Sequence, residues 1–235
     1  MKAGITLYPR HDVALNPELP ADAEFWTPEP DDIDEEEGFG YFRDVWPILN
    51  VSADEALAVY RRDKALSTLV ADLATNEREF DILASVAETG SDDEVEGITG
   101  DQVAALVDHF PEAEELEGLE IGVAGLVYAL AAAGMYPAAS CRGHVGPNSW
   151  SVLPVVCFAA DFPHAQALQP LVEDAGCGFE IDSARRDLLV VTSASIEDTL
   201  DLAQRILNGI SKFPTDMTNA DEPGPASSQT TLFDS

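Results

Sequence analysis

Apolar residues recur at helical spacing three times in the first half of the chain. The first predicted helix starts at a capping box formed by Ser52 and Glu55. A second predicted helix spans residues 76–88, and a third, short one begins with Asp101 as its N-cap. We therefore expect residues 51–117 to form a small helical unit.

A strongly apolar stretch follows this unit. Residues 119–133 are rich in alanine and glycine and predict a helix closed by Gly134 as its C-terminal cap. The apolar run from residue 121 to 136 is interrupted by glycines and is shorter than the roughly 20 residues needed to cross a bilayer. The pattern therefore predicts a buried helix and no membrane-spanning segment.

From residue 136 onward, the order strand, strand, helix occurs twice. The strands are predicted at residues 136–142, 151–159, 178–182 and 187–192, and the helices at 163–175 and 195–211. Two such units make a four-stranded, mainly antiparallel sheet with helices on one face. The predicted fold class is α+β, a two-layer sandwich formed by residues 118–213. Pro154 indicates that its strand lies at an edge or carries a bulge.

The two ends of the chain lack a sustained period. Residues 1–50 combine prolines, acids and isolated aromatics, which predicts an extended acidic arm held on the surface by its aromatic side chains. Residues 214–235 have the composition of a disordered tail.

Charge narrows the classes of partner. The 235 residues include 44 acids and 12 bases, for a formal net charge of −32. Such a field repels phosphates, so we do not expect direct nucleic-acid binding. The acidity is typical of a solvated surface in a high-salt or GC-rich background, and the alternative is a surface that mimics DNA. Three scattered cysteines and the lack of a signal-peptide pattern favour a cytoplasmic, reduced protein.

The candidate chemistry is concentrated in the segment from Ser140 to His144. Cys141 and His144 are candidate catalytic residues, because a thiol beside a guanidinium and near an imidazole can act as a nucleophile. Ser140, Arg142 and Gly143 are candidate ligand-binding residues, because backbone amides and a bidentate guanidinium suit a small anion. A plain tight turn at Gly143 with no chemistry is the remaining interpretation.

A zinc site is the third chemical alternative. Cys141 and His144 have the spacing of two zinc ligands, C-x-x-H. Two further ligands would have to come from Cys157, Cys177, His164, His109 or nearby acids. No second ligand pair is evident, so the sequence assigns no metal ligands and leaves the cofactor open.

This segment carries a resemblance. The run Ser-Cys-Arg-Gly-His from Ser140 to His144, followed by the strand at 151–159, resembles a Ser-Cys-x-Gly-His pattern of bacterial and phage proteins without assigned function. It is also similar to the Ser-Cys-Ser-Gly-Arg signature of the wybutosine-synthesis (Tyw3/Taw3) family, from which it departs at Arg142 and His144. The resemblance covers residues 119–211 and implies a ligand-binding strand and turn rather than a tRNA-modifying activity.

The C-terminal tail suggests a partner. Gln229, Leu232 and Phe233 form a Gln-x-x-Leu-Phe sequence that resembles the peptides by which bacterial replication and repair proteins bind the β sliding clamp. Leu232 and Phe233 would bury in an apolar cleft while Gln229 fixes the orientation by hydrogen bonds.

The sequence thus predicts a protein with a small-ligand, anion-binding or thiol-dependent catalytic turn, recruited to the DNA replication and repair machinery by its tail. The alternative is a non-enzymatic acidic interaction protein or DNA mimic.

Overall fold

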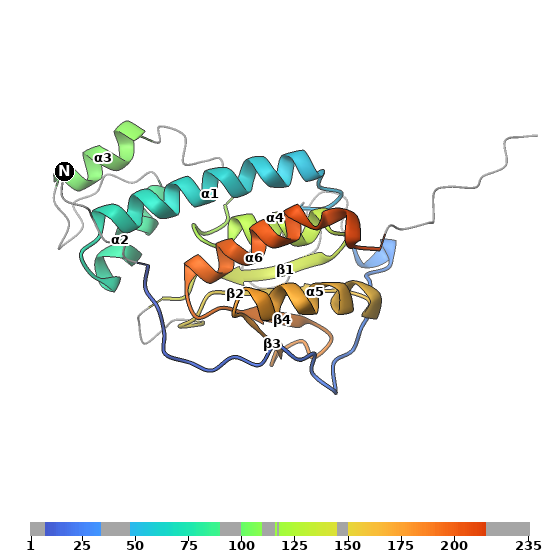
Figure 1. The fold of residues 1–235 in the computed structure, drawn as a ribbon. Helices are drawn as coiled ribbons and strands as arrows, with labels where there is room; N and C mark the ends of the chain where they lie inside the picture. The colour runs from blue at the N-terminus through green and yellow to red at the C-terminus, as the bar shows by residue number, and fades with distance from the viewer. Residues whose placement is uncertain are drawn as a thin grey trace, which may run out of the picture.

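The computed structural model describes residues 8–33, 48–89, 100–109, 116, 118–144 and 150–214. The chain folds as an α+β protein (Figure 1). Its α-helices are α1 (Ala53–Leu73), α2 (Glu77–Thr89), α3 (Gly100–His109), α4 (Ala124–Ala132), α5 (Phe162–Asp174) and α6 (Ile196–Asn208). Its strands are β1 (Tyr136–Cys141), β2 (Val155–Ala159), β3 (Gly178–Ile181) and β4 (Leu189–Thr192), and 3-10 turns occur at Pro30–Asp32 and Ile210–Lys212.

The four strands form one sheet in the order β1-β2-β4-β3, with every neighbouring pair antiparallel. Each strand–strand–helix unit contributes a hairpin, and the two hairpins join through β2 and β4 at the centre. This arrangement confirms the predicted α+β fold with its four-stranded antiparallel sheet.

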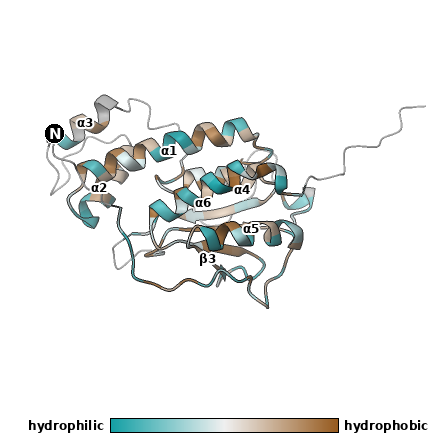
Figure 2. Cartoon of the chain, viewed as in Figure 1, coloured by the Kyte–Doolittle hydropathy of each residue, from teal (hydrophilic) through white to brown (hydrophobic). Residues whose placement is uncertain are grey.

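The sheet buries both of its faces. Val156 and Phe158 of β2 belong to a large core that also holds side chains of α1, α4, α5 and α6. Helices α4 and α6 pack on each other and α1 packs across both (Figure 1), and Figure 2 shows the alternation of hydrophobic and hydrophilic residues along α1, α5 and α6. The opposite face, which includes Cys141 and Cys157, contacts Trp26 and Leu49. The helices of residues 51–117 and one face of the sheet therefore contribute to the same hydrophobic core.

The N-terminal arm lies along the sheet as an extended segment. Within residues 8–33 the backbone makes an isolated bridge between Arg10 and Ser195, and Asn16 O accepts a hydrogen bond from Phe179 N at 2.8 Å. Trp26 Nε1 donates to the backbone oxygen of Asp187 at 2.6 Å. Trp26 thus anchors the arm, as its aromatic character predicted.

The start of β2 and the place of the irregularity in the sheet differ from prediction. Strand β2 begins at Val155 rather than at residue 151, because Ser151 Oγ bonds the backbone N–H and oxygen of Leu153 and Pro154 offers no N–H donor. The sheet's irregularity lies between Pro137 and Ala139 of β1, not at Pro154.

The apolar helix α4 begins later than predicted and α3 slightly earlier. Gly118 and Gly122 have φ values of 77° and 90°, so residues 118–123 form a turn and α4 starts at Ala124. Its predicted C-terminal cap is confirmed, since Gly134 has φ 82°. Helix α3 starts at Gly100, which places Asp101 inside the helix rather than at its N-cap.

None of the helices in these described ranges combines the length and the hydropathy needed for a membrane span. The tail, with Gln229, Leu232 and Phe233, lies outside the described residues, as do Tyr41, Phe42 and Trp46 of the predicted arm.

Candidate functional site

The chain makes a tight turn where β1 ends. Gly143 has φ 85°, and a Cβ at this position would lie 2.8 Å from the backbone of Leu153. His144 N donates to Ser151 O at 3.0 Å, which closes the turn. Ser140 stays within β1, opposite Val156. The turn therefore brings the side chains of Arg142 and His144 next to α2, where both contact Asp81.

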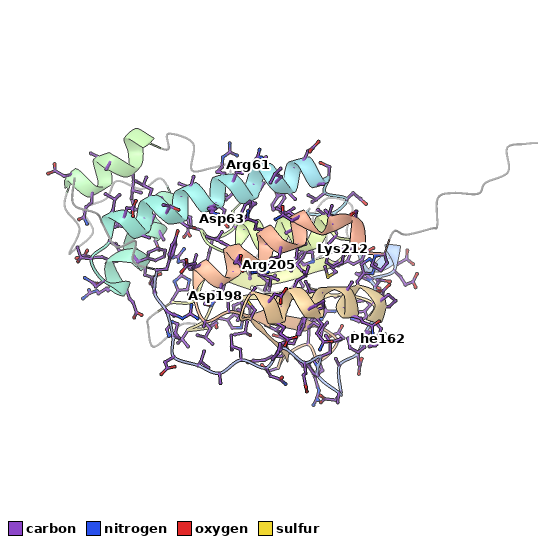
Figure 3. All side chains as sticks on the ribbon, viewed as in Figure 1. Arg61, Asp63, Phe162, Asp198, Arg205 and Lys212 are labelled. Carbon is purple, nitrogen blue, oxygen red and sulfur yellow. The ribbon has the colours of Figure 1, made fainter. Side chains whose placement is uncertain are left out.

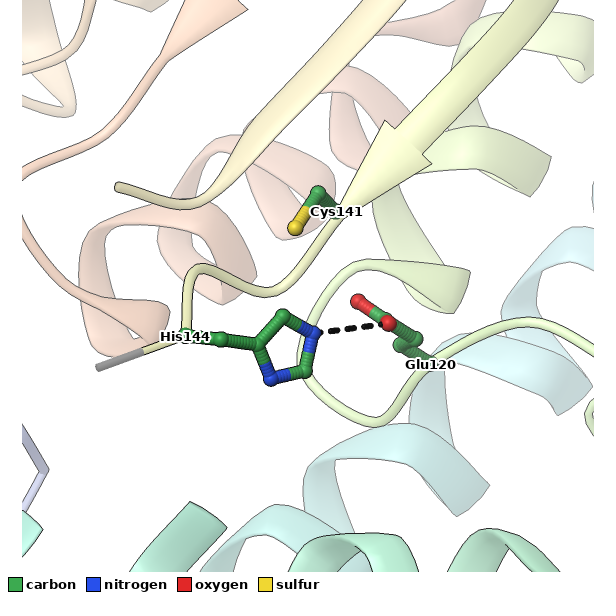
Figure 4. A group of neighbouring side chains, drawn as sticks. All are labelled: Glu120, Cys141 and His144. Carbon is green, nitrogen blue, oxygen red and sulfur yellow. Dashed lines mark hydrogen bonds and ion pairs between the residues drawn. The ribbon is translucent and has the colours of Figure 1, made fainter. Parts of the chain in front are cut away.

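The imidazole of His144 lies between two carboxylates. His144 Nδ1 is 2.7 Å from Asp81 Oδ1 of α2, and Nε2 is 2.9 Å from Glu120 Oε1 in the turn before α4 (Figure 4). Hydrogen bonds to Asp81, Cys141 and Glu120 raise the pKa of His144 to about 11. The imidazole therefore carries a proton at neutral pH.

Arg142 turns inward rather than outward. Its side chain is 1% exposed and pairs with Asp81 Oδ1 at 3.0 Å and with Glu88 Oε1 of α2, while its backbone N donates to Glu120 Oε2 at 2.6 Å. The predicted bidentate contact of this guanidinium with an external anion therefore has no support in the geometry, because internal carboxylates already occupy it.

The carboxylates of the site differ in their proton affinity. Burial raises the pKa of Glu88 to about 7 despite its contact with Arg142. Burial acts in the same direction on Asp81 and Glu120, but hydrogen bonds and charge interactions with His144 and Arg142 together outweigh it and hold the pKa of both carboxyls below the usual range. Two carboxylates thus remain ionised beside the protonated His144 and the guanidinium of Arg142.

Cys141 joins this cluster from the last position of β1. One ligand atom each of Glu120, Cys141 and His144 lies within 4.8 Å of the others (Figure 4). The thiol is buried, at 4% exposure, and Sγ accepts a hydrogen bond from Gly143 N at 3.4 Å. A thiol, an imidazole and a carboxylate therefore converge on one point.

The other ligands considered from the sequence lie elsewhere. Cys157 Sγ points to Asp182 at 3.9 Å, Cys177 Sγ contacts Ser193 Oγ at 3.2 Å, and His164 Nδ1 binds Asp161 at 2.7 Å. The side chain of His109 lies outside the described residues.

The sequence did not predict three side chains of the site, those of Asp81, Glu88 and Glu120. Glu120 lies 22 residues before Arg142 along the chain, and Asp81 and Glu88 lie on helix α2. A signal exists for each: Glu120 is the only charged residue between Leu119 and Cys141, and Asp81 and Glu88 share one helix face seven residues apart.

An open cleft adjoins the site on the side of Asp81. The arm, α2, the Gly143 turn, the segment before β2 and the start of α6 line it, with Pro9, His11, Phe80, Asp81, Val152 and Ile196 among its residues. Val152 is 56% exposed, although its side chain is apolar. Most of the wall is apolar and the acidic part lies next to His144.

Comparison with known proteins assigns no family to this arrangement: no family model matches the chain, and neither a curated protein nor a solved structure gives a significant match.

Proposed function

We propose that this protein binds a divalent transition-metal ion of the zinc type through Glu120, Cys141 and His144. The observation that carries the proposal is the convergence of their three ligand atoms within 4.8 Å. Thiolate, imidazole and carboxylate are the protein ligands of zinc, and three of them with one open position is the arrangement of catalytic zinc sites.

The groups around the three ligands fit such an ion. Asp81 holds His144 Nδ1, which leaves Nε2 to face the metal, and a carboxylate in this role is the usual partner of a metal-binding histidine. Arg142 N holds Glu120 Oε2 and leaves Oε1 toward His144. Binding of the ion would displace the proton on Nε2 and the proton of the Cys141 thiol, so two protons would leave for one divalent ion and the net charge of the site would stay the same.

Zinc with an open position lowers the pKa of bound water to about 7 and so supplies a hydroxide for hydrolysis or hydration. In the proposed enzyme, Asp81 orients His144, and substrate approaches the metal site from the adjoining cleft. The reaction class we infer is metal-assisted hydrolysis or hydration.

This proposal accounts for Cys141 better than a nucleophilic role does. A cysteine nucleophile needs access to substrate. Cys141 is buried, at 4% exposure, so its thiol is poorly placed to attack an external substrate. As a metal ligand Cys141 needs contact with the ion only, and its Sγ already lies within 4.8 Å of the ligand atoms of Glu120 and His144.

Titration with Co²⁺ tests the proposal, because a cobalt–thiolate bond absorbs in the near ultraviolet. We expect the full chain to bind one equivalent with this absorption. Cys141→Ser should remove the band, while Glu120→Gln and His144→Gln should weaken binding at least about tenfold. Cys177→Ala is the matched control. It removes a buried thiol that contacts Ser193, and it should leave the cobalt–thiolate band and the Co²⁺ affinity unchanged.

Absence of Co²⁺ binding, or a thiolate band that survives in Cys141→Ser, contradicts the proposal.

A second function concerns the tail. We propose that Gln229, Leu232 and Phe233 dock the protein on a bacterial sliding clamp, on the basis of the Gln-x-x-Leu-Phe sequence. Binding of the full chain to purified clamp should be lost in the double variant Leu232→Ala, Phe233→Ala and kept in Thr230→Ala, which changes a position that the motif leaves variable. Equal binding by wild type and double variant, or none by wild type, would refute it.

A further inference from the structure

A buried carboxylate on α1 holds the turn that carries Glu120. Asp63 is fully buried, and its Oδ1 accepts hydrogen bonds from Gly122 N at 2.5 Å and from Ser67 Oγ at 3.3 Å. Its Oδ2 accepts a hydrogen bond from Gly125 N at 2.8 Å. Figure 3 shows Asp63 on α1, which packs against α4. One side chain thus binds both the turn and the first residues of the helix that follows.

Neither of these two glycines has room for a side chain. A Cβ on Gly122 would lie 2.6 Å from Ile196 Cγ2, and one on Gly125 would lie 3.2 Å from Tyr60 Cα. The turn is therefore enclosed between α1 and α6. Asp63 supplies the hydrogen bonds inside this enclosure, where water does not reach.

An apolar residue at position 63 would fill the same interface without the desolvation of a carboxyl group. Burial raises the pKa of Asp63 to about 6, since the buried carboxylate loses its hydration. The contacts that offset it go to Gly122, Gly125 and Ser67, so the carboxylate's distinctive contribution is to fix the backbone of the turn.

Glu120 lies two residues before Gly122, at the start of the segment that Asp63 fixes. A second carboxylate supports the same segment, because Glu88 Oε1 accepts a hydrogen bond from Ile121 N at 2.7 Å. The residues directly after Glu120 are therefore fixed by carboxylates from two different helices. The reach of Glu120 Oε1 to His144 depends on where this backbone lies.

We propose that Asp63 is a positioning residue for the metal site: it fixes the backbone at Gly122 and Gly125 so that Glu120 reaches the point where Cys141 and His144 converge. The inference rests on the proposed metal-binding function. Asp63 itself touches neither the metal nor its ligands.

Co²⁺ affinity of the full-length Asp63→Asn variant tests this role. Asparagine keeps the size of the side chain but replaces one acceptor by an NH₂ group that faces a backbone N–H. We expect Co²⁺ affinity to fall about 10- to 100-fold, the range for loss of a group that orients a metal ligand, with a weaker and shifted visible cobalt spectrum as the coordination geometry changes.

Asp182→Asn is the matched control. Asp182 is also buried and accepts hydrogen bonds from Ala184 N at 2.9 Å and Arg185 N at 2.6 Å, but it follows β3 at the sheet edge opposite β1. Asp182→Asn should lower stability to urea and leave Co²⁺ affinity and spectrum unchanged, so a general loss of stability is distinguished from a positioning effect.

A folded Asp63→Asn variant that binds Co²⁺ as tightly as wild type, with the same spectrum, overturns this inference alone. If the variant does not fold, Ser67→Ala removes one bond to Asp63 Oδ1 and should lower affinity a few-fold; unchanged affinity there overturns it as well. If wild type binds no Co²⁺, the metal site and this inference fail together.

Discussion

Two carboxylates hold a proton on the imidazole of His144. Its ring nitrogens contact Asp81 and Glu120, and its side chain is 28% exposed. Two carboxylates around one imidazole favour the charged form, and the pKa of His144 rises from 6.5 to about 11. The same contacts would favour a metal ion on Nε2.

In protein freed of metal by a chelator, His144 should remain protonated through pH 8. Because its folded pKa lies above the unfolded value of 6.5, its contribution to stability is complete below pH 6.5 and is lost as the pH rises toward 11. Asp81→Asn should lower this pKa by more than about one unit, since the bond to Asp81 is its largest cause. NMR titration of the histidine ring measures both values, and titration of His144 near pH 6.5 in the wild type would contradict this account.

The sequence placed Cys141, Arg142 and His144 in the site because they are adjacent along the chain. It could not show that the guanidinium of Arg142 pairs with Asp81 and Glu88, since nothing local indicates that these carboxylates lie opposite it. Glu120 was missed for the same physical reason: side chains far apart in sequence converge only once the helices pack.

At the scale of elements, the turn after β1 depends on a left-handed glycine. Gly143 combines φ 85° with a Cβ direction blocked by the backbone of Val152 and Leu153. A side chain at position 143 would have to displace the backbone of Val152 and Leu153 or the turn itself, and the turn carries His144.

Gly143→Ala should therefore cost about 3 kcal/mol or more, from backbone strain and overlap together. Gly176→Ala is the matched control: Gly176 has φ 70° but no atom within 4 Å of its Cβ position, so only the conformational cost of about 1 kcal/mol applies. Urea unfolding of the two variants gives the difference. Equal losses would show that the turn has room for a side chain.

Most elements were predictable because their periods are local. The strand–strand–helix order of residues 136–211 followed from alternation and amphipathic spacing, and the structure confirms it. The start of α4 could not be predicted in this way. Gly122 takes φ 90° because of its contacts with Ile196 and Asp63, which are both remote in sequence. The strand order is likewise set by the pairing of β2 with β4.

The large negative charge of the whole molecule lowers the stability of its folded state. A net charge of −32 on 235 residues makes the folded state repel itself. Among the described residues, surface ion pairs such as Arg10 with Asp198 and Arg186 with Asp22 offset only part of this repulsion.

Raising the salt concentration should therefore stabilise the protein. The screening length falls from about 10 Å at 0.1 M to about 3 Å at 1 M, which weakens repulsion between surface carboxylates more than it weakens buried pairs such as Arg142 with Asp81. Thermal unfolding should shift to higher temperature between 0.1 and 1 M KCl. A downward shift would show that surface attraction, not repulsion, controls stability.

X-ray absorption at the zinc edge of the full-length protein, loaded with one equivalent of Zn²⁺, tests whether Glu120, Cys141 and His144 bind the ion. We expect one sulfur at about 2.3 Å and nitrogen and oxygen neighbours at about 2.0–2.2 Å, with the sulfur lost in Cys141→Ser. A shell of oxygen and nitrogen alone in the wild type, or no retained zinc, would contradict the proposed metal site.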